Sequence, residues 1–207
     1  MRRHSALAGS TMHATRPDVL SSTAGSQIVE FAVALPLLLV LVVGIFDFGT
    51  AFNIKQKLVN ATREGARVAS SQPTNDLWPP AAAGGCGAPQ SVCAIRDAVD
   101  NALITNAMRD CGLAASAGAA AGNLAWAFTP GGCAGPMTLT IERGFVPPLS
   151  ATLNPPFQPN YQIEMTRVTL NYPYQWTFNR VIQLLVSTAN YPATTQFNSV
   201  AIMQNLN

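Results

Sequence analysis

Hydrophobic residues are concentrated in one segment near the amino terminus. From Phe31 to Phe46 the chain carries no charged residue, and the wider apolar segment runs from Ile28 to Phe52. At 1.5 Å per residue a helix over this wider segment would be about 37 Å long, which exceeds the roughly 30 Å of hydrocarbon in a bilayer. We therefore predict a transmembrane helix, bent at Pro36, where one backbone hydrogen bond is lost.

The helical pattern continues beyond the apolar segment to about residue 71. Small and apolar residues recur there at helical spacing, while the charged residues fall on other faces. Ala61, Gly65 and Ala69, spaced four residues apart, form a narrow seam with almost no side chain. Two interpretations of this seam stay open: it packs on the chain's own globular domain, or it packs on another subunit.

The rest of the chain predicts a small α+β domain. Apolar residues repeat at helical spacing over residues 90–112, which indicates an amphipathic helix that ends at Gly112. Hydrophobic alternation in residues 137–144 and 161–178 indicates strands, and we expect Pro173 to interrupt the longer one. The predicted fold is thus a single transmembrane helix extended outside the membrane, followed by an amphipathic helix packed on an antiparallel sheet.

Glycine and proline mark loops or linkers in three segments, at residues 78–89, 112–122 and 145–160. The apolar segment 180–189 is too short for its periodicity to distinguish a helix from a strand. Residues before the apolar segment are polar and show no period. The predicted organisation is a leader peptide (1–25), a transmembrane and extended helix (26–71) and an extracytoplasmic α+β domain (72–207).

Four cysteines lie after the apolar segment, at Cys86, Cys93, Cys111 and Cys133. Their spacing lacks the CxxC pairs or Cys/His mixtures of zinc sites, so we favour two disulfides and an oxidising compartment. Free buried thiols are the alternative. Of the three possible connectivities, we predict Cys86 with Cys93 and Cys111 with Cys133, because this choice closes the two shortest independent loops.

Composition and motifs argue against several classes of function. Charged residues make up 11% of the chain and its formal net charge is +2, which gives no reason to expect a nucleic-acid partner. Both histidines, His4 and His13, lie in the leader, and no phosphate-binding glycine motif is present. Asp97, Asp100 and Asp110 fit a solvated helix face better than acid–base machinery. We expect no enzymatic activity, no metal and no cofactor.

Glu30 stands at the start of the charge-free run, five residues after Gly25. This arrangement resembles the processing site of type IV prepilins, in which a membrane aspartic peptidase cuts after the glycine. The resemblance implies cleavage between Gly25 and Ser26. The new Ser26 amine could then pair with Glu30 of the same or a neighbouring chain, which would make a carboxylate at this position tolerable. The alternative is that Glu30 is an ordinary anchor residue that reaches the membrane interface.

The longer stretch "EFAVALPLLLVLVVGIFDFG", followed by "KLVNATREGARVAS", resembles the amino-terminal signature of the TadE-like family, the pseudopilins of the Flp/Tad pilus assembly system. The signature covers residues 25–71. It implies a pseudopilin-like structural protein that helps to assemble or cap a pilus at the bacterial envelope. Its partners would be a prepilin peptidase, the inner membrane, and other pilus and pseudopilin subunits that bind the amino-terminal helix. The alternatives are a membrane-tethered binding module or adhesin that enters no filament, and an extracytoplasmic enzyme.

Charge alone does not decide the membrane topology. Arg2, Arg3 and Arg16 favour a cytoplasmic amino terminus, but the segment after the apolar run is also net positive. The cysteines and the leader motif favour a single-pass protein of the inner membrane with a cytoplasmic amino terminus. The carboxyl-terminal domain would then be periplasmic or extracellular.

Overall fold

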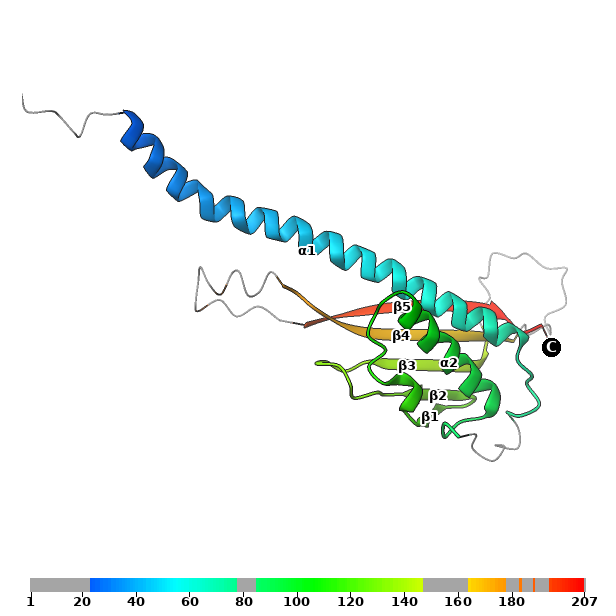
Figure 1. Cartoon of the computed structure of the whole chain (residues 1–207). Coiled ribbons are helices and arrows are strands. Elements are labelled where there is room, and N and C mark those ends of the chain that lie inside the picture. Colours follow the sequence, from blue (N-terminus) through cyan, green and yellow to red (C-terminus); the bar gives the residue numbers. More distant parts are fainter. Residues whose placement is uncertain are drawn as a thin grey trace, which may run out of the picture. The chain divides into compact units, whose positions relative to one another are not determined.

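The computed structural model describes residues 23–77, 85–146, 164–177 and 194–206, together with residues 183 and 188. The chain divides into two compact units, Met1–Leu41 and Val42–Asn207, with the boundary inside the first helix. The elements are α1 (Thr23–Ser71), α2 (Gln90–Thr105), the short 3-10 helix η1 (Leu113–Ala115), β1 (Gly118–Gly122), β2 (Ala125–Phe128), β3 (Thr138–Phe145), β4 (Met165–Gln175) and β5 (Thr194–Gln204) (Figure 1). The predicted leader lies almost entirely outside the described residues.

The second unit contains a five-stranded antiparallel sheet in the order β1-β2-β3-β4-β5. Its longest pairing joins β4 and β5, from Met165 opposite Gln204 to Gln175 opposite Thr194. Side chains alternate along these strands, so that the inner positions of β4, such as Val168 and Leu170, are fully buried. Each strand therefore pairs with its neighbour in sequence, and the predicted α+β class is confirmed.

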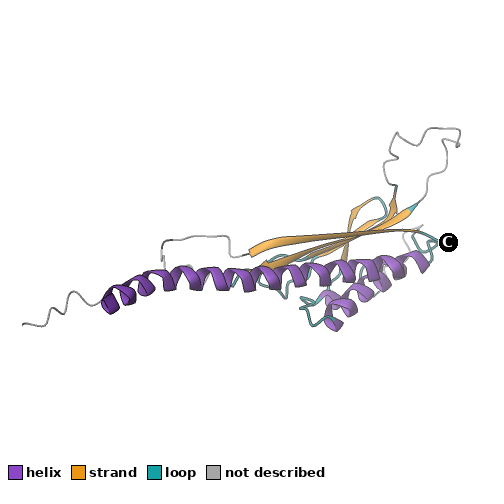
Figure 2. Ribbon diagram, turned by 90° about the horizontal axis from the view of Figure 1, so that it is seen from above, coloured by secondary structure: helices purple, strands orange, loops and turns teal. Residues whose placement is uncertain are grey.

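Both helices of the second unit cover the same face of this sheet (Figure 2). Apolar residues from α1, α2 and the inner face of the sheet meet in one core, which contains Leu58, Ala61, Ala66 and Ala69 of α1, Val92, Ile95, Val99 and Leu103 of α2, and Leu139, Ile141, Val168, Leu170 and Ala201 of the strands. The opposite face carries polar pairs such as Glu142 with Arg167. The core thus fixes α1 from its middle onward to the sheet.

The amphipathic helix α2 is shorter than predicted. It ends at Thr105 and not at Gly112. The side-chain amide of Asn106 donates to the carbonyl of Ala102 at 2.7 Å. Ala107 has a positive φ of 53°, a backbone conformation that ends an α-helix. Apolar positions continue past this turn because Met108 is half-buried and Cys111 and Leu113 are buried.

Pro173 does not interrupt β4, contrary to the prediction. The strand runs through Pro173, which lies opposite Gln196 of β5, and ends at Gln175. The last paired residue of β4 on the β3 side is Asn171. Pro173 therefore has a neighbouring strand on one edge only, and its missing N–H costs little at such a position.

One of the segments predicted as a loop contains a strand. Within residues 112–122, the stretch Gly118–Gly122 forms β1 at the edge of the sheet and pairs with β2. Its alanines and glycines are mostly exposed and carry no hydrophobic alternation, so the pairing leaves no trace in the sequence pattern. Most of the other two predicted loops, and most of the undecided segment 180–189, lie outside the described residues.

Candidate functional site

The predicted cleavage site lies in the first turns of α1. The helix begins at Thr23, and Gly25, Ser26 and Glu30 are exposed. The first amides of a helix have no partner within it, so the bond between Gly25 and Ser26 lies where the helix opens most easily. Ser26 and Glu30 are four residues apart and thus lie on the same side of the helix.

The residues that follow form a helix that is apolar on all sides. Large side chains are exposed around its whole circumference, among them Ile28, Val29, Phe31, Val33, Leu35, Leu37, Leu38, Leu39, Leu41 and Val42. Among the described residues one helix, Gly25–Ser71, is long and apolar enough to cross a membrane, with a mean hydropathy of 2.8 in its most apolar window. A helix that is hydrophobic all round needs an apolar environment.

The seam of Ala61, Gly65 and Ala69 packs inside its own chain. Ala61 and Ala69 are fully buried, and a Cβ added at Gly65 would lie 2.5 Å from Cγ2 of Val99 on α2. Of the two interpretations, the structure thus supports packing on the chain's own domain. Glycine is needed at position 65 because the two helix backbones approach closely there.

A polar contact beside the seam joins α1 to the edge strand. The hydroxyl of Thr62 lies 3.0 Å from that of Ser199 on β5, and both residues are buried. Thr62 also bonds to its own helix, 3.1 Å from the carbonyl of Leu58. The two hydroxyls satisfy each other in a place where water has no access.

Asp47 is a buried acid that sequence reasoning missed. It is 4% exposed, and its Oδ1 accepts a hydrogen bond of 2.8 Å from the hydroxyl of Tyr174 on β4. Burial, and secondarily the Asp47 carboxylate, raise the pKa of Tyr174 to about 12. The sequence signal was present, because Asp47 is the first acid after the charge-free run, but its partner lies 127 residues further along the chain.

Aromatic rings continue from this contact to both sides. Trp176 meets Tyr174 edge to face at 4.9 Å and Phe48 at 5.4 Å, and Tyr174 stacks on Phe197 of β5 at 5.1 Å. The indole N–H of Trp176 donates to the hydroxyl of Thr195 at 2.6 Å. These rings connect α1 with the ends of β4 and β5.

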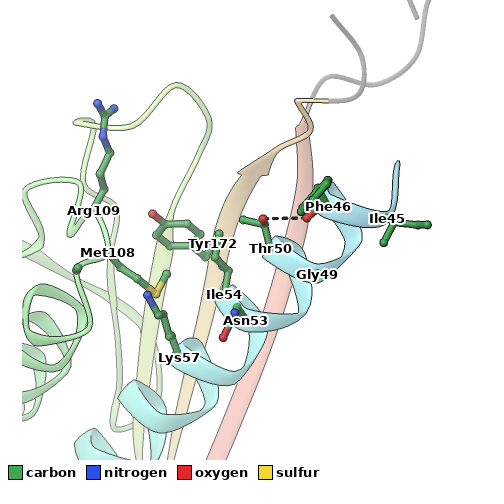
Figure 3. A pocket seen from close by; sticks show the side chains of 11 residues that line it. Ile45, Phe46, Gly49, Thr50, Asn53, Ile54, Lys57, Met108, Arg109 and Tyr172 are labelled. Atoms are coloured by element: carbon green, nitrogen blue, oxygen red, sulfur yellow. Dashed lines mark hydrogen bonds between the residues drawn. The ribbon is translucent and has the colours of Figure 1, made fainter. Parts of the chain in front are cut away.

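A groove of about 640 Å³ opens beside the same turns of α1. Figure 3 shows α1 on one side of it and Met108, Arg109 and Tyr172 on the other. Its apolar wall includes Ile45 and Ile54, and its charged residues are Lys57 and Arg109. With two cations and no acid among its lining residues, the groove is suited to an anionic group.

The three aspartates predicted on a solvated face differ from one another. Asp97 is half exposed and pairs with Arg96 at 2.7 Å. Asp100 is buried, contrary to the prediction, and its Oδ1 has no hydrogen-bond partner. Burial, with a smaller contribution from Asp110, raises the pKa of Asp100. Among the described residues no group of three His, Cys, Asp or Glu side chains could hold a metal ion.

Both predicted disulfides are present. Cys86 is bonded to Cys93 with their Cα atoms 5.8 Å apart, and Cys111 to Cys133 with a Cα separation of 5.0 Å. The first bridge fixes the start of α2 to the preceding turn. The second joins the segment after α2 to the segment between β2 and β3.

Residues 25–67 match the family described as TadE-like protein. This match confirms the resemblance over the predicted cleavage site, the apolar helix and most of its extension. No curated protein and no solved structure matches the chain.

Proposed function

We propose that this protein is a pseudopilin-like structural subunit that acts in the assembly of a Tad/Flp-type pilus at the bacterial envelope. Its role would be packing and not catalysis. The observation that carries the proposal is the TadE-like segment, 25–67, whose first part is an apolar helix with exposed side chains. Such a helix can pass from lipid to a bundle of similar helices without losing its apolar surroundings.

The charges at the start of α1 could align neighbouring helices in such a bundle. Cleavage after Gly25 would create an ammonium group at Ser26, one helical turn from Glu30. In an apolar bundle each charge needs a partner of opposite sign, because an unpaired charge is costly there. Pairing Glu30 with the Ser26 amine of a neighbouring subunit would fix the register of the two helices.

The intrachain packing of the seam limits where other subunits could bind. Ala61, Gly65 and Ala69 are covered by the chain's own domain. The proposed contact with pilus subunits is therefore confined to the apolar part of α1, from Ile28 to Phe46, and to the charges that precede it. The processing enzyme would be a prepilin peptidase.

The proposed location is the inner membrane, with a single pass and a cytoplasmic amino terminus. The carboxyl-terminal domain would be periplasmic or extracellular. The two disulfides support this side for the domain, because disulfides persist in oxidising compartments.

The test compares wild-type protein with Glu30→Gln in a pulldown of pilus components from membranes. Glu30→Gln keeps the size of the side chain but leaves the Ser26 ammonium unpaired, a loss of about 3 to 5 kcal/mol for a buried pair. We expect equal membrane levels and lost association. Glu64→Gln is the matched control, since Glu64 lies on the same helix in an exposed pair with Arg67 at 2.6 Å.

The outcome also separates the proposal from its main rival, a tethered module that enters no filament. If neither the wild type nor the control retains pilus components, the tethered module is favoured. If Glu30→Gln retains them as well as the wild type does, Glu30 is an ordinary interface residue and the pairing is wrong.

A further inference from the structure

The length of the apolar helix limits where it can leave the hydrocarbon. A helix over residues 25–46 is about 33 Å long at 1.5 Å per residue, close to the roughly 30 Å of a bilayer core. The next residue is Asp47, and a charged side chain is costly within hydrocarbon. The boundary between hydrocarbon and headgroups therefore lies near Phe46.

Asp47 also fixes the end of the sheet at this level. Its carboxylate is bonded to Tyr174, two residues before Trp176. Phe46, Asp47 and Tyr174 all belong to the second unit, so the bond is part of one compact body. The strand ends carry backbone groups that cannot enter hydrocarbon. The end of β4 thus lies beside the turn of α1 that contains Asp47.

Exposed aromatic side chains gather at the same end. Phe46, Phe48 and Phe52 are 72%, 70% and 67% exposed, although all three are large and apolar. Trp176 is partly exposed beside Phe48, and Thr195 satisfies its N–H. We call Phe46, Phe48, Phe52 and Trp176 the aromatic rim. Tryptophan is enriched where membrane proteins cross the interface, because its amphipathic ring suits the headgroup level, and phenylalanines on the apolar face of an interfacial helix bury their rings at the boundary with the acyl chains.

The groove beside the rim adds positive charge. It begins at Ile45 and Phe46 and extends to Lys57 and Arg109. Lys57 lies about 16 Å along α1 from Phe46, beyond the layer of lipid phosphates but near enough to feel the surface field of an anionic membrane. Basic residues near an anionic membrane surface are attracted to it.

We propose that the aromatic rim rests in the headgroup region of the bilayer that α1 enters, so that this end of the globular unit is a lipid-binding surface. The partner is the membrane itself, and anionic phospholipid is the favoured headgroup for the groove. The proposal requires the membrane helix but no filament, and it can therefore succeed where the proposed pilus function fails.

The test uses the full chain in vesicles of phosphatidylcholine and phosphatidylglycerol that contain a lipid with a quencher near the headgroup. Trp176 is compared with Trp126, which is also partly buried but lies on β2. Trp126 lies opposite Ile141 of β3, which lies opposite Val168 of β4. Val168 is six residues before Tyr174, so Trp126 is about 20 Å from Tyr174 along the strand direction. Single-tryptophan chains are made with phenylalanine at the two other tryptophan positions.

We expect the emission of Trp176 to be quenched at least about twofold more than that of Trp126, and more by a label near the headgroup than by one in the middle of the acyl chain. Equal quenching of both tryptophans, or stronger quenching of Trp126, would overturn the proposal. Retained disulfides and circular dichroism show that each chain is folded. If Trp126→Phe fails to fold, the wild-type chain labelled with 5-fluorotryptophan gives the same comparison through line broadening by a spin-labelled lipid.

A second pair of variants tests the rim directly. Phe48→Ser with Phe52→Ser removes two exposed rings and should reduce the quenching of Trp176. Gln56→Ser, an exposed change one turn further along α1, should leave it unchanged. Unchanged quenching in the rim variant would show that these phenylalanines are not lipid contacts.

Discussion

Arg143 reaches from β3 to the carboxyl end of α1 and donates to the backbone carbonyl of Ala69. Its guanidinium also donates to the carbonyls of Gln72 and Pro73, each at 3.0 Å, and the residue is 1% exposed. The last carbonyls of a helix have no partner within it and carry partial negative charge. A buried arginine of the sheet therefore satisfies carbonyl groups at the carboxyl end of α1.

Arg143→Met should destabilise the protein strongly, because it removes the hydrogen bonds that the buried guanidinium donates to these three carbonyls. We expect a loss of about 3 kcal/mol in the free energy of unfolding, measured by urea denaturation of the full chain in detergent. Arg143→Lys should lose less, since it keeps the charge but not the fork of donors. Arg63→Met, an exposed change on α1, is the control. An unchanged midpoint for Arg143→Met would contradict the capping role.

Gly65→Ala should also destabilise the protein, although alanine favours helices by about 1 kcal/mol over glycine. The new methyl group would lie 2.5 Å from Cγ2 of Val99, and a β-branched residue on a helix has little freedom to move aside. Overpacking typically costs about 1 to 3 kcal/mol, so the net effect should be a loss.

Val99→Ala combined with Gly65→Ala should recover part of that loss, which a thermal melt of the double variant would reveal. Gly49→Ala is the matched control, since a Cβ there would meet nothing within 4 Å. Equal stability of Gly65→Ala and Gly49→Ala would show that the helices separate at little cost.

Tyr174 should make stability depend on alkaline pH. Its pKa is raised to about 12 in the folded chain, above the ordinary value of about 10. Below pH 10 the phenol is protonated in both states. Between pH 10 and 12 only the unfolded chain releases the proton, so the free energy of unfolding should fall by about 2 kcal/mol.

The measurement is denaturant unfolding at pH 9 to 12, supported by titration of tyrosinate absorbance. In Tyr174→Phe, the part of the decrease in unfolding free energy that comes from Tyr174 should be absent. Tyr172, whose pKa burial also raises, remains as an internal reference. An identical pH dependence in the variant and the wild type would assign the effect to other groups.

Processing should remove the leader after Gly25. Mass spectrometry of the membrane fraction should detect a mature chain that begins at Ser26, and Gly25→Leu should accumulate the precursor, because a side chain there blocks close approach to the backbone. Gly49→Leu, a change on the same helix away from the bond, should be cut normally. A wild-type chain that still begins at Met1 would refute this processing.

The sequence pattern predicted those parts of the fold in which partners are local or periodic. The small-residue face of α1, the α2 repeat and the strands around Leu139 and Leu170 follow from spacing alone. Pairing of each cysteine with its nearest neighbour was also predictable, because short loops close at the lowest entropic cost.

The remaining features depend on contacts between distant segments. Asp100 lies under the η1 segment, where the backbone of Ala114 is hydrogen-bonded to it. The helical spacing within α2 could not predict that η1 covers this residue. Asp47 and Arg143 likewise find their partners on other elements. Strand β1 consists of alanine and glycine, so backbone pairing defines it and hydrophobic alternation does not.

The bond between Thr62 and Ser199 joins residues that are 137 positions apart, and this separation imposes an order on biosynthesis. At about 5 to 20 residues per second, a ribosome needs about 7 to 27 seconds to move from Thr62 to Ser199. The closer partner of the helix is α2, through Gly65 and Val99, and it is completed much sooner. The nascent helix can therefore dock first on α2 and leave Thr62 solvated until β5 arrives. The sheet therefore gains its last strand, β5, only after the chain has been translated past Ser199.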